Sequence, residues 1–306
     1  MLKYSILFIG LLFTALCAKA QIAKRYKYKD LVFSDVTIDK DLSYALNAHP
    51  NEKKSWLFDL YRPKDDGSSP RPLIIWMHGG GFKFGTKEAK GIQLWSKSFA
   101  QRGYVCVAIN YRLSKKNPLF DFDEFKKSCY NGVQDVKMAV EYFKLHHMEY
   151  NIDTNKIILA GNSAGGLIAL QATYSTDAEL AKMADVADTS ANKQGLLKIA
   201  GVINFWGGIF DLDWLKNARV PIVSVLGSKD NLVPPTHKSA PLYGGIDIHK
   251  QADALNLPNE LKVFDGYSHE LQRQFNPFFS AGKGTQKRWL MAGQFAADFL
   301  YKSLFH

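Results

Sequence analysis

Short apolar runs alternate with amphipathic stretches along most of the chain. The runs at residues 72–77 and 104–109 are apolar throughout, as in strands that a parallel sheet buries on both faces. Residues 123–146 carry apolar side chains at helical spacing, with Val133, Val136 and Val140 on one face. The pattern therefore predicts strands that alternate with helices.

The same pattern gives the order of the expected elements. Strands are expected at residues 55–61, 72–77, 104–111, 155–160, 199–205, 221–226 and 261–264, and helices at 123–146, 164–174 and 285–304, with an amphipathic stretch at 87–101. The first strands follow one another without a helix, which predicts an antiparallel edge. Residues 177–195 and 271–284 are interpreted as insertions. The fold class expected is α/β, with a mostly parallel central sheet flanked by helices on both faces.

The first twenty residues have the pattern of a signal peptide. Lys3 gives a positive start, residues 6–16 are apolar, and Ala18-Lys19-Ala20 has the small-x-small form of a cleavage site. Cys17 suggests lipoprotein processing instead, but the bulky Leu16 before it disfavours that alternative. We expect cleavage after Ala20, a single domain at residues 21–306, and a secreted or periplasmic protein without stable membrane insertion. An uncleaved anchor is the alternative.

Composition and charge exclude several other classes of protein. A hydrophobic content of 46% suits a globular core, and the formal net charge of +10 comes mainly from scattered lysines without a nucleic-acid-binding motif. Two cysteines remain after cleavage, Cys106 and Cys129, and neither has the spacing of a metal site. They are expected to be buried thiols rather than a disulfide. No cofactor, metal or nucleic acid is expected.

One glycine-rich segment carries the pattern of a catalytic nucleophile. Gly161-Asn162-Ser163-Ala164-Gly165 lies directly between a predicted strand and a predicted helix. A serine on such a tight turn is held in a strained conformation with its oxygen exposed, and it needs small neighbours so that strand and helix can approach. Ser163 is therefore the candidate nucleophile.

A second glycine-rich segment follows the strand predicted at residues 72–77. His78-Gly79-Gly80-Gly81-Phe82 lets the backbone turn its N–H groups toward a negatively charged oxygen. Gly80, Gly81 and Ala164, the residue after the nucleophile, are the expected oxyanion donors. A phosphate-binding loop is the rival interpretation, but the Lys-Ser/Thr of such loops is missing. His78 is expected to brace the loop rather than transfer a proton.

Two later loops offer an acid and a base. Asp230 and His269 each come just after a predicted strand, in the order serine, acid, histidine that accompanies this serine turn. The imidazole would accept the serine proton, and the acid would orient the imidazole. The alternatives that remain open are Asp211, Asp213 and Asp265 for the acid, and His237 and His249 for the base.

With these motifs the chain resembles the α/β-hydrolase fold esterases of the hormone-sensitive-lipase-like and carbohydrate-esterase-like kind. The likeness extends from about residue 54 to the C-terminus. It includes Asn110-Tyr111-Arg112-Leu113 and Asp135, where Arg112 and Asp135 are interpreted as structural. The chain departs from many relatives at Asn162, where they have Asp or Glu, and at Glu270, where a small residue is usual.

The resemblance implies a serine carboxylic-ester hydrolase. A long hydrophobic lid is not evident, which favours short acyl groups. The resemblance to carbohydrate esterases implies short acyl or hydroxycinnamoyl esters, either small molecules or groups carried on polysaccharides. A serine peptidase of the same fold and a non-catalytic binding protein are the alternatives, and the sequence leaves the oligomeric state open. The residues expected near the substrate are Phe82, Tyr111, Trp206 and Phe210, and the insertion at residues 271–284, with Phe275, Phe278 and Phe279, is either a pocket wall or a surface loop.

Overall fold

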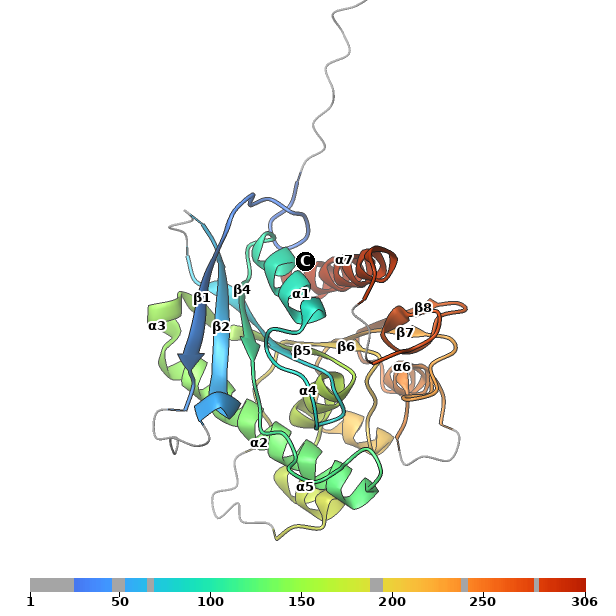
Figure 1. Cartoon of the computed structure of the whole chain (residues 1–306). Coiled ribbons are helices and arrows are strands. Elements are labelled where there is room, and N and C mark those ends of the chain that lie inside the picture. The colour runs from blue at the N-terminus through green and yellow to red at the C-terminus, as the bar shows by residue number, and fades with distance from the viewer. Residues whose placement is uncertain (1–24, 46–52, 65–68, 188–194, 238–241, 278–280) are drawn as a thin grey trace, which may run out of the picture.

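A computed structural model describes residues 25–45, 53–64, 69–187, 195–237, 242–277 and 281–306. The described strands form one eight-stranded sheet in the order β1-β2-β4-β3-β5-β6-β7-β8 (Figure 1). The predicted signal peptide at residues 1–20 lies outside the described residues. The strands are β1 (Val36–Ser43), β2 (Leu57–Pro63), β3 (Arg71–Met77), β4 (Val105–Ile109), β5 (Ile152–Asn162), β6 (Gly201–Phe205), β7 (Ile222–Gly227) and β8 (Asn259–Phe264).

Most of the sheet is parallel. β1 pairs with β2, and β2 with β4, in antiparallel fashion, whereas all the remaining neighbours from β4 to β8 are parallel. This confirms the predicted mostly parallel sheet with an antiparallel edge. β1 was not expected from the sequence. It is an edge strand whose residues are half-buried or exposed, so no alternation of buried and exposed side chains marks it.

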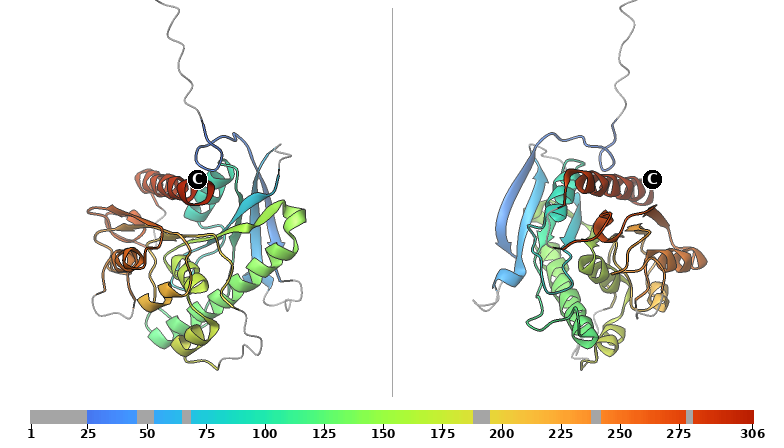
Figure 2. Two further views of the ribbon diagram at one scale, coloured as in Figure 1. Left: turned by 180° about the vertical axis from the view of Figure 1, so that it is seen from behind. Right: turned by 45° about the vertical axis from the view of Figure 1, so that its right-hand side comes forward.

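Helices cover both faces of the sheet (Figures 1 and 2). Apolar side chains between the sheet and the helices form one core cluster on each face. On one face lie α1 (Lys90–Ala100) and α7 (Lys283–Phe305); on the other lie α2 (Phe122–Leu145), α4 (Ala164–Tyr174), α5 (Asp177–Ala184) and α6 (Gly245–Ala254), while α3 (His147–Tyr150) is a short turn after α2. The 3-10 helices are η1 (Lys53–Trp56), η2 (Leu212–Lys216) and η3 (His269–Leu271).

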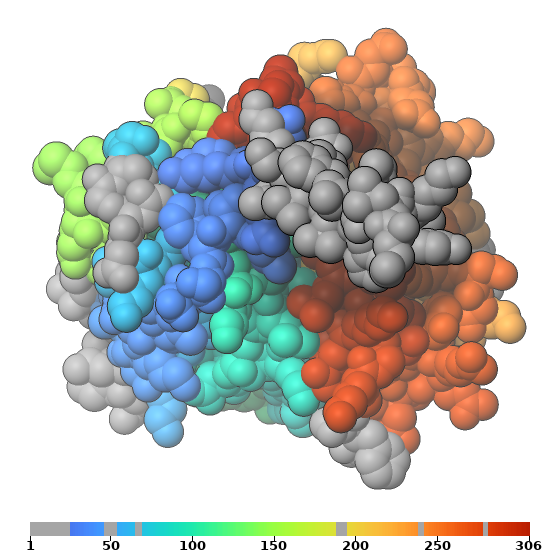
Figure 3. Space-filling model, turned by 90° about the horizontal axis from the view of Figure 1, so that it is seen from above, coloured from blue at the N-terminus to red at the C-terminus, as the bar shows by residue number. Residues whose placement is uncertain are grey.

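The N-terminal residues of the described chain pack on the α1 and α7 face. The Tyr28 ring stacks on Phe305 of α7 with centroids 4.5 Å apart, and the Tyr28 N–H donates to the Arg102 carbonyl oxygen over 2.7 Å. In Figure 3 the blue N-terminal residues, the blue-green residues and the red residues of α7 meet on this face. The Tyr28 ring is therefore part of the folded domain.

The two cysteines are buried and unbonded, as predicted. Cys106, in β4, belongs to the core cluster on the α1 and α7 face. Cys129, in α2, belongs to the cluster on the opposite face. Burial raises the pKa of both thiols, so each side chain behaves as a small apolar group.

A buried carboxylate fixes the segment that follows β4. Asp135 of α2 is 2% exposed and accepts hydrogen bonds from the Arg112 backbone N–H (2.7 Å) and from Arg112 Nε (2.8 Å). The neighbouring Tyr111 donates from its hydroxyl to the His78 carbonyl oxygen over 2.8 Å. The ion pair therefore positions a segment that contacts the glycine-rich loop after β3.

We expect Asp135→Ala to lower the free energy of unfolding by about 2 kcal/mol, because it removes the acceptor for the backbone N–H and the guanidinium of Arg112 while water still reaches the guanidinium. Urea unfolding at pH 7 measures the change. Glu141→Ala is the matched control, since it removes an exposed pair with Lys144 on the same helix and should cost less than about 0.5 kcal/mol. Equal effects of the two substitutions would contradict the bracing role of Asp135.

Candidate active site

Ser163 occupies a strained turn between β5 and α4. Its backbone lies in the positive-φ region (φ 52°, ψ −121°), which few residues other than glycine adopt. A Cβ on Gly161 would collide with the Gly165 backbone, and a Cβ on Gly165 would collide with the Met77 and His78 carbonyls. Ser163 itself is partly exposed although its neighbours in the chain are buried. The glycines therefore allow the close approach that the turn requires.

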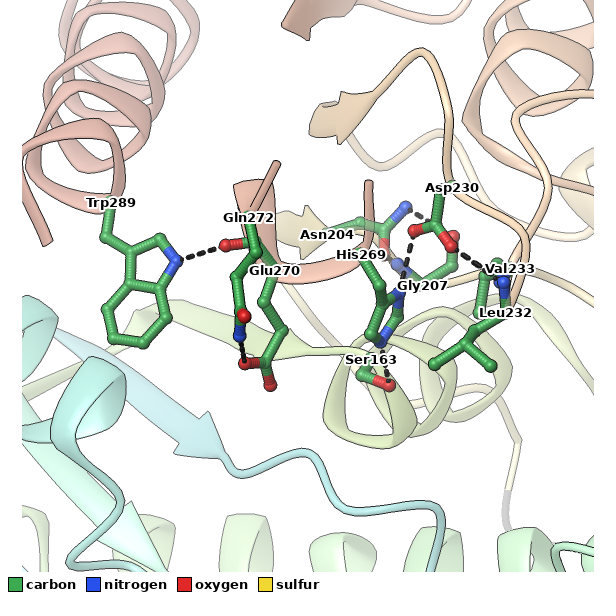
Figure 4. Close-up of polar contacts among 10 residues, drawn as sticks. All are labelled: Ser163, Asn204, Gly207, Asp230, Leu232, Val233, His269, Glu270, Gln272 and Trp289. Atoms are coloured by element: carbon green, nitrogen blue, oxygen red, sulfur yellow. Dashed lines mark hydrogen bonds and ion pairs between the residues drawn. The ribbon is translucent and has the colours of Figure 1, made fainter. Parts of the chain in front are cut away.

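The structure brings Ser163, His269 and Asp230 together in one hydrogen-bonded series (Figure 4). His269 Nε2 lies 2.8 Å from Ser163 Oγ, and His269 Nδ1 lies 2.7 Å from Asp230 Oδ2. His269 is 2% exposed and Asp230 is 1% exposed, so the base and the acid meet away from water. A proton leaving the serine oxygen has an imidazole nitrogen within hydrogen-bonding distance.

The second oxygen of Asp230 is bound to the backbone. Asp230 Oδ1 accepts hydrogen bonds from the N–H groups of Leu232 (2.9 Å) and Val233 (3.0 Å) (Figure 4). These bonds fix the carboxylate in the loop after β7. Because both oxygens have partners, the carboxylate can hold the imidazole in one orientation.

The alternative acids and bases make other contacts. Asp211 caps η2 by accepting from the Asp213 N–H, and Asp265 accepts from the Ser228 hydroxyl over 2.8 Å. His249 Nδ1 contacts the Asn259 side chain, and His237 Nδ1 contacts the Leu242 carbonyl oxygen. Of the candidates named from the sequence, only Asp230 and His269 are hydrogen-bonded in series with Ser163.

The loop after β3 contains backbone N–H groups that donate to no described residue. Gly80 has φ 109° and Gly81 has φ 58°, and a Cβ on either would collide with Phe84 or Leu119. No described residue accepts a hydrogen bond from the N–H of Gly80, Gly81 or Ala164. Ala164 is also the first residue of α4, where the helix dipole favours negative charge. These donors could stabilise an oxyanion next to Ser163.

Polar side chains and ring stacking brace this loop against the serine turn. Asn162 Oδ1 accepts from the Gly79 N–H over 3.2 Å, which joins the residue before the nucleophile to the first glycine. The His78 ring stacks on Tyr111 with centroids 4.4 Å apart, and His78 Nδ1 lies 2.7 Å from the Gly79 carbonyl oxygen. Burial lowers the pKa of His78 to about 4, so its imidazole is neutral at pH 7.

Three of the four rings expected near the substrate are packing residues. Phe82 is 0% exposed, and Tyr111 and Trp206 are each 1% exposed, so none of them offers surface to a ligand. Trp206 packs with Trp95 and Trp289 on the α1 and α7 face. These rings were expected near the substrate because each follows a strand end, but a ring at such a position can turn inward over the sheet as readily as outward.

Two other predicted rings keep accessible surface. Phe210 is half-buried and packs edge-on against Phe122 and Phe125. Phe275 is half-buried and meets the His269 ring edge-on with centroids 5.1 Å apart. Phe278 and Phe279 lie outside the described residues. The part of the insertion at residues 271–284 that is described thus contacts the candidate base.

A sequence profile of the BD-FAE family matches residues 58–231. The chain belongs to the BD-FAE family. The matched segment contains both glycine-rich motifs and Asp230, and it ends before His269.

Sequence relatives of this BD-FAE chain are named as esterases. The probable carboxylic ester hydrolase LipM of Mycobacterium tuberculosis is 28% identical over 228 residues, which are 73% of this chain and 47% of LipM. The chain spans less than half the length of the relatives it matches.

Solved structures similar to the BD-FAE chain include esterase 2 of Thermogutta terrifontis. The form phosphorylated by paraoxon is 21% identical with a TM-score of 0.60, over 89% of this chain and 96% of the esterase. The butyrate-bound form is 21% identical with a TM-score of 0.58, over 92% of this chain and 98% of the esterase. Together with the strand order, this likeness confirms the α/β-hydrolase fold.

Two polar contacts near the site were not found from the sequence. The Trp289 indole N–H donates to the Glu270 carbonyl oxygen over 2.7 Å, and the Gly207 N–H donates to Asn204 Oδ1 over 3.0 Å (Figure 4). The sequence does mark Asn204, because it is a polar residue inside an apolar strand. It does not mark the contact of Trp289, because only the tertiary fold of this BD-FAE protein brings α7 to the turn that carries His269 and Glu270.

Among the residues that the structure describes, no group of three or more His, Cys, Asp or Glu side chains could hold a metal ion. Within the same residues, no helix has the length and apolar character needed to cross a membrane.

The lowered pKa of His78 predicts an acid-dependent loss of stability. The unfolded chain protonates a histidine near pH 6.5, whereas folded His78 does so only at about 4. The unfolded state therefore binds more protons between these values, and stability rises with pH across that window. His78→Phe keeps a ring against Tyr111 and should remove about 2 kcal/mol of the stability difference between pH 7 and pH 4.5. Urea unfolding of both proteins at both pH values measures this difference; an unchanged one would contradict the prediction.

Proposed function

We propose that this BD-FAE protein is a serine carboxylic-ester hydrolase that works through an acyl-enzyme. The observation that carries the proposal is the series of hydrogen bonds from Ser163 through His269 to Asp230, with lengths of 2.8 and 2.7 Å. The partly exposed position of Ser163 and the esterase names of its relatives support the same chemistry.

In the acylation half, Ser163 Oγ attacks the ester carbonyl carbon while neutral His269 accepts the serine proton at Nε2. The carbonyl oxygen becomes an oxyanion, for which the N–H groups of Gly80, Gly81 and Ala164 are the proposed donors. The imidazolium then gives its proton to the alcohol oxygen as the bond from carbon to that oxygen breaks. The alcohol leaves, and the acyl group stays on Ser163.

Deacylation repeats these steps with water as the nucleophile. His269 accepts a proton from the water, whose oxygen attacks the acyl carbon, and then returns a proton to Ser163 Oγ as the carboxylic acid is released. Asp230 remains a carboxylate throughout. Its role is to hold the imidazole in the tautomer that leaves Nε2 free to accept, and to stabilise the charged ring.

The proposed substrates are short acyl or hydroxycinnamoyl esters, as small molecules or on polysaccharides. The butyrate-bound form of the Thermogutta terrifontis esterase supports a short acyl group. The accessible rings of Phe210 and Phe275 support an aromatic one, since rings of this kind stack with a hydroxycinnamoyl group. We also propose that the protein is exported after loss of residues 1–20, which suits a substrate outside the cell.

Asp230→Asn tests the proposed triad. The variant should fold but lose about 10⁴-fold in kcat for p-nitrophenyl acetate, because an amide cannot hold the imidazole in the productive tautomer. Asp265→Asn is the matched control, since Asp265 accepts a hydrogen bond from Ser228 in the neighbouring loop and should keep nearly full activity.

Ser163→Ala should lose nearly all turnover of p-nitrophenyl acetate, because the acyl-enzyme cannot form without the serine oxygen. Residual turnover in Ser163→Ala at the wild-type rate, or a larger loss in Asp265→Asn than in Asp230→Asn, would contradict the mechanism.

A further inference from the structure

Glu270, the residue after the candidate base, stands in a strained and tightly held turn. Glu270 has φ 55° and Leu271 has φ 56°, so two consecutive residues other than glycine adopt the positive-φ conformation. Their carbonyl oxygens accept from Trp289 Nε1 and Arg288 Nε, each over 2.7 Å. Since α7 holds both carbonyls, the direction of the Glu270 side chain is set by the fold.

The Glu270 carboxylate accepts fewer hydrogen bonds from the described residues than a carboxylate can accept. Its one hydrogen-bond partner among the described residues is the Gln272 amide at 3.2 Å, and no described Lys, Arg or His forms an ion pair with it. The side chain is half-buried, and burial raises the pKa of the Glu270 carboxyl, against an opposing effect of His269. A carboxyl group accepts several hydrogen bonds, so this one has room for a ligand.

The Glu270 carboxylate also lies on the same side of the turn as the His269 ring (Figure 4). In Figure 4 the side chains of Glu270 and His269 extend from the turn in the same direction, toward the level of the Ser163 hydroxyl. The proposed mechanism requires His269 to give a proton to the alcohol oxygen, so the alcohol half of the ester lies against His269. A side chain beside His269 therefore faces that half rather than the acyl half.

We propose that Glu270 is a specificity-determining residue that accepts a hydrogen bond from a hydroxyl group on the alcohol half of the ester. The proposal rests on the proposed esterase function, and it selects polyhydroxylated alcohols such as glycerol or a sugar over simple alkyl alcohols. A hydroxyl group suits Glu270 whether its carboxyl is ionised or protonated, because it both donates and accepts. A cationic alcohol would need the ionised form, which burial disfavours.

Three acetate esters that share one acyl group test this proposal. Propyl acetate, glycerol 1-monoacetate and acetylcholine differ only in the alcohol half. Glu270→Met keeps the side-chain length but removes both acceptors, so its kcat/KM for the glycerol ester should fall about tenfold relative to that for propyl acetate. Glu270→Gln keeps one neutral acceptor and should lose less. Glu141→Gln, on the far end of α2, is the control and should leave the ratio unchanged.

The outcomes separate this proposal from the function on which it rests. Propyl acetate turnover by the wild-type protein reports the esterase function alone, and its absence would overturn both. Intact propyl acetate turnover with an unchanged ratio in Glu270→Met would overturn only the role of Glu270. An equal loss for all three esters would mean that the carboxylate merely holds the histidine turn, and a selective loss for acetylcholine would mean a cation site. Either result also overturns hydroxyl recognition.

Discussion

The backbone conformation of Ser163 is the constraint on which the rest of the site depends. A residue other than glycine at φ 52° and ψ −121° is strained by about 1–3 kcal/mol, so the surrounding structure must hold it. All eleven residues of α4 are buried, and the Ser163 N–H donates to the Phe205 carbonyl oxygen over 2.9 Å. Because Gly165 lets α4 approach the end of β3, the same turn brings the Gly80 and Gly81 loop beside the serine.

The chemistry and the selectivity come from different parts of the molecule. Asp230 and His269 follow β7 and β8, adjacent parallel strands whose carboxyl ends lie at the same edge of the sheet as Ser163, so the fold brings all three together. Both are buried and fixed by hydrogen bonds. Glu270, which has a free acceptor, lies in η3 beside His269, and Phe275, which has free surface, lies in the loop that follows η3. Loops on a rigid sheet can change the substrate while the reacting atoms stay in place.

The parts of the structure that local pattern determines could be predicted from the sequence. The apolar runs predicted the parallel strands, and the glycines around Ser163 predicted the tight turn that carries the serine. β1 was not predicted, because an edge strand whose residues are half-buried or exposed has no hydrophobic pattern. Asp230 was the predicted acid, but Asp211, Asp213 and Asp265 stayed open as alternatives, since the choice depends on which loop reaches His269. The burial of Trp206 and the contact between Trp289 and residue 270 are tertiary, so no local signal marks them.

The central claim is that His269 activates Ser163 as a nucleophile, and the rate of labelling by a fluorophosphonate probe tests it most directly. Peptide mass spectrometry should find the label on Ser163 alone, because among the residues that the structure describes only the Ser163 hydroxyl has an imidazole acceptor, at 2.8 Å. Replacing His269 with Ala should slow labelling by about 10²–10⁴-fold, the usual contribution of a general base. Labelling of His269→Ala at the wild-type rate, or a label on another residue when Ser163 is replaced by Ala, would contradict the account.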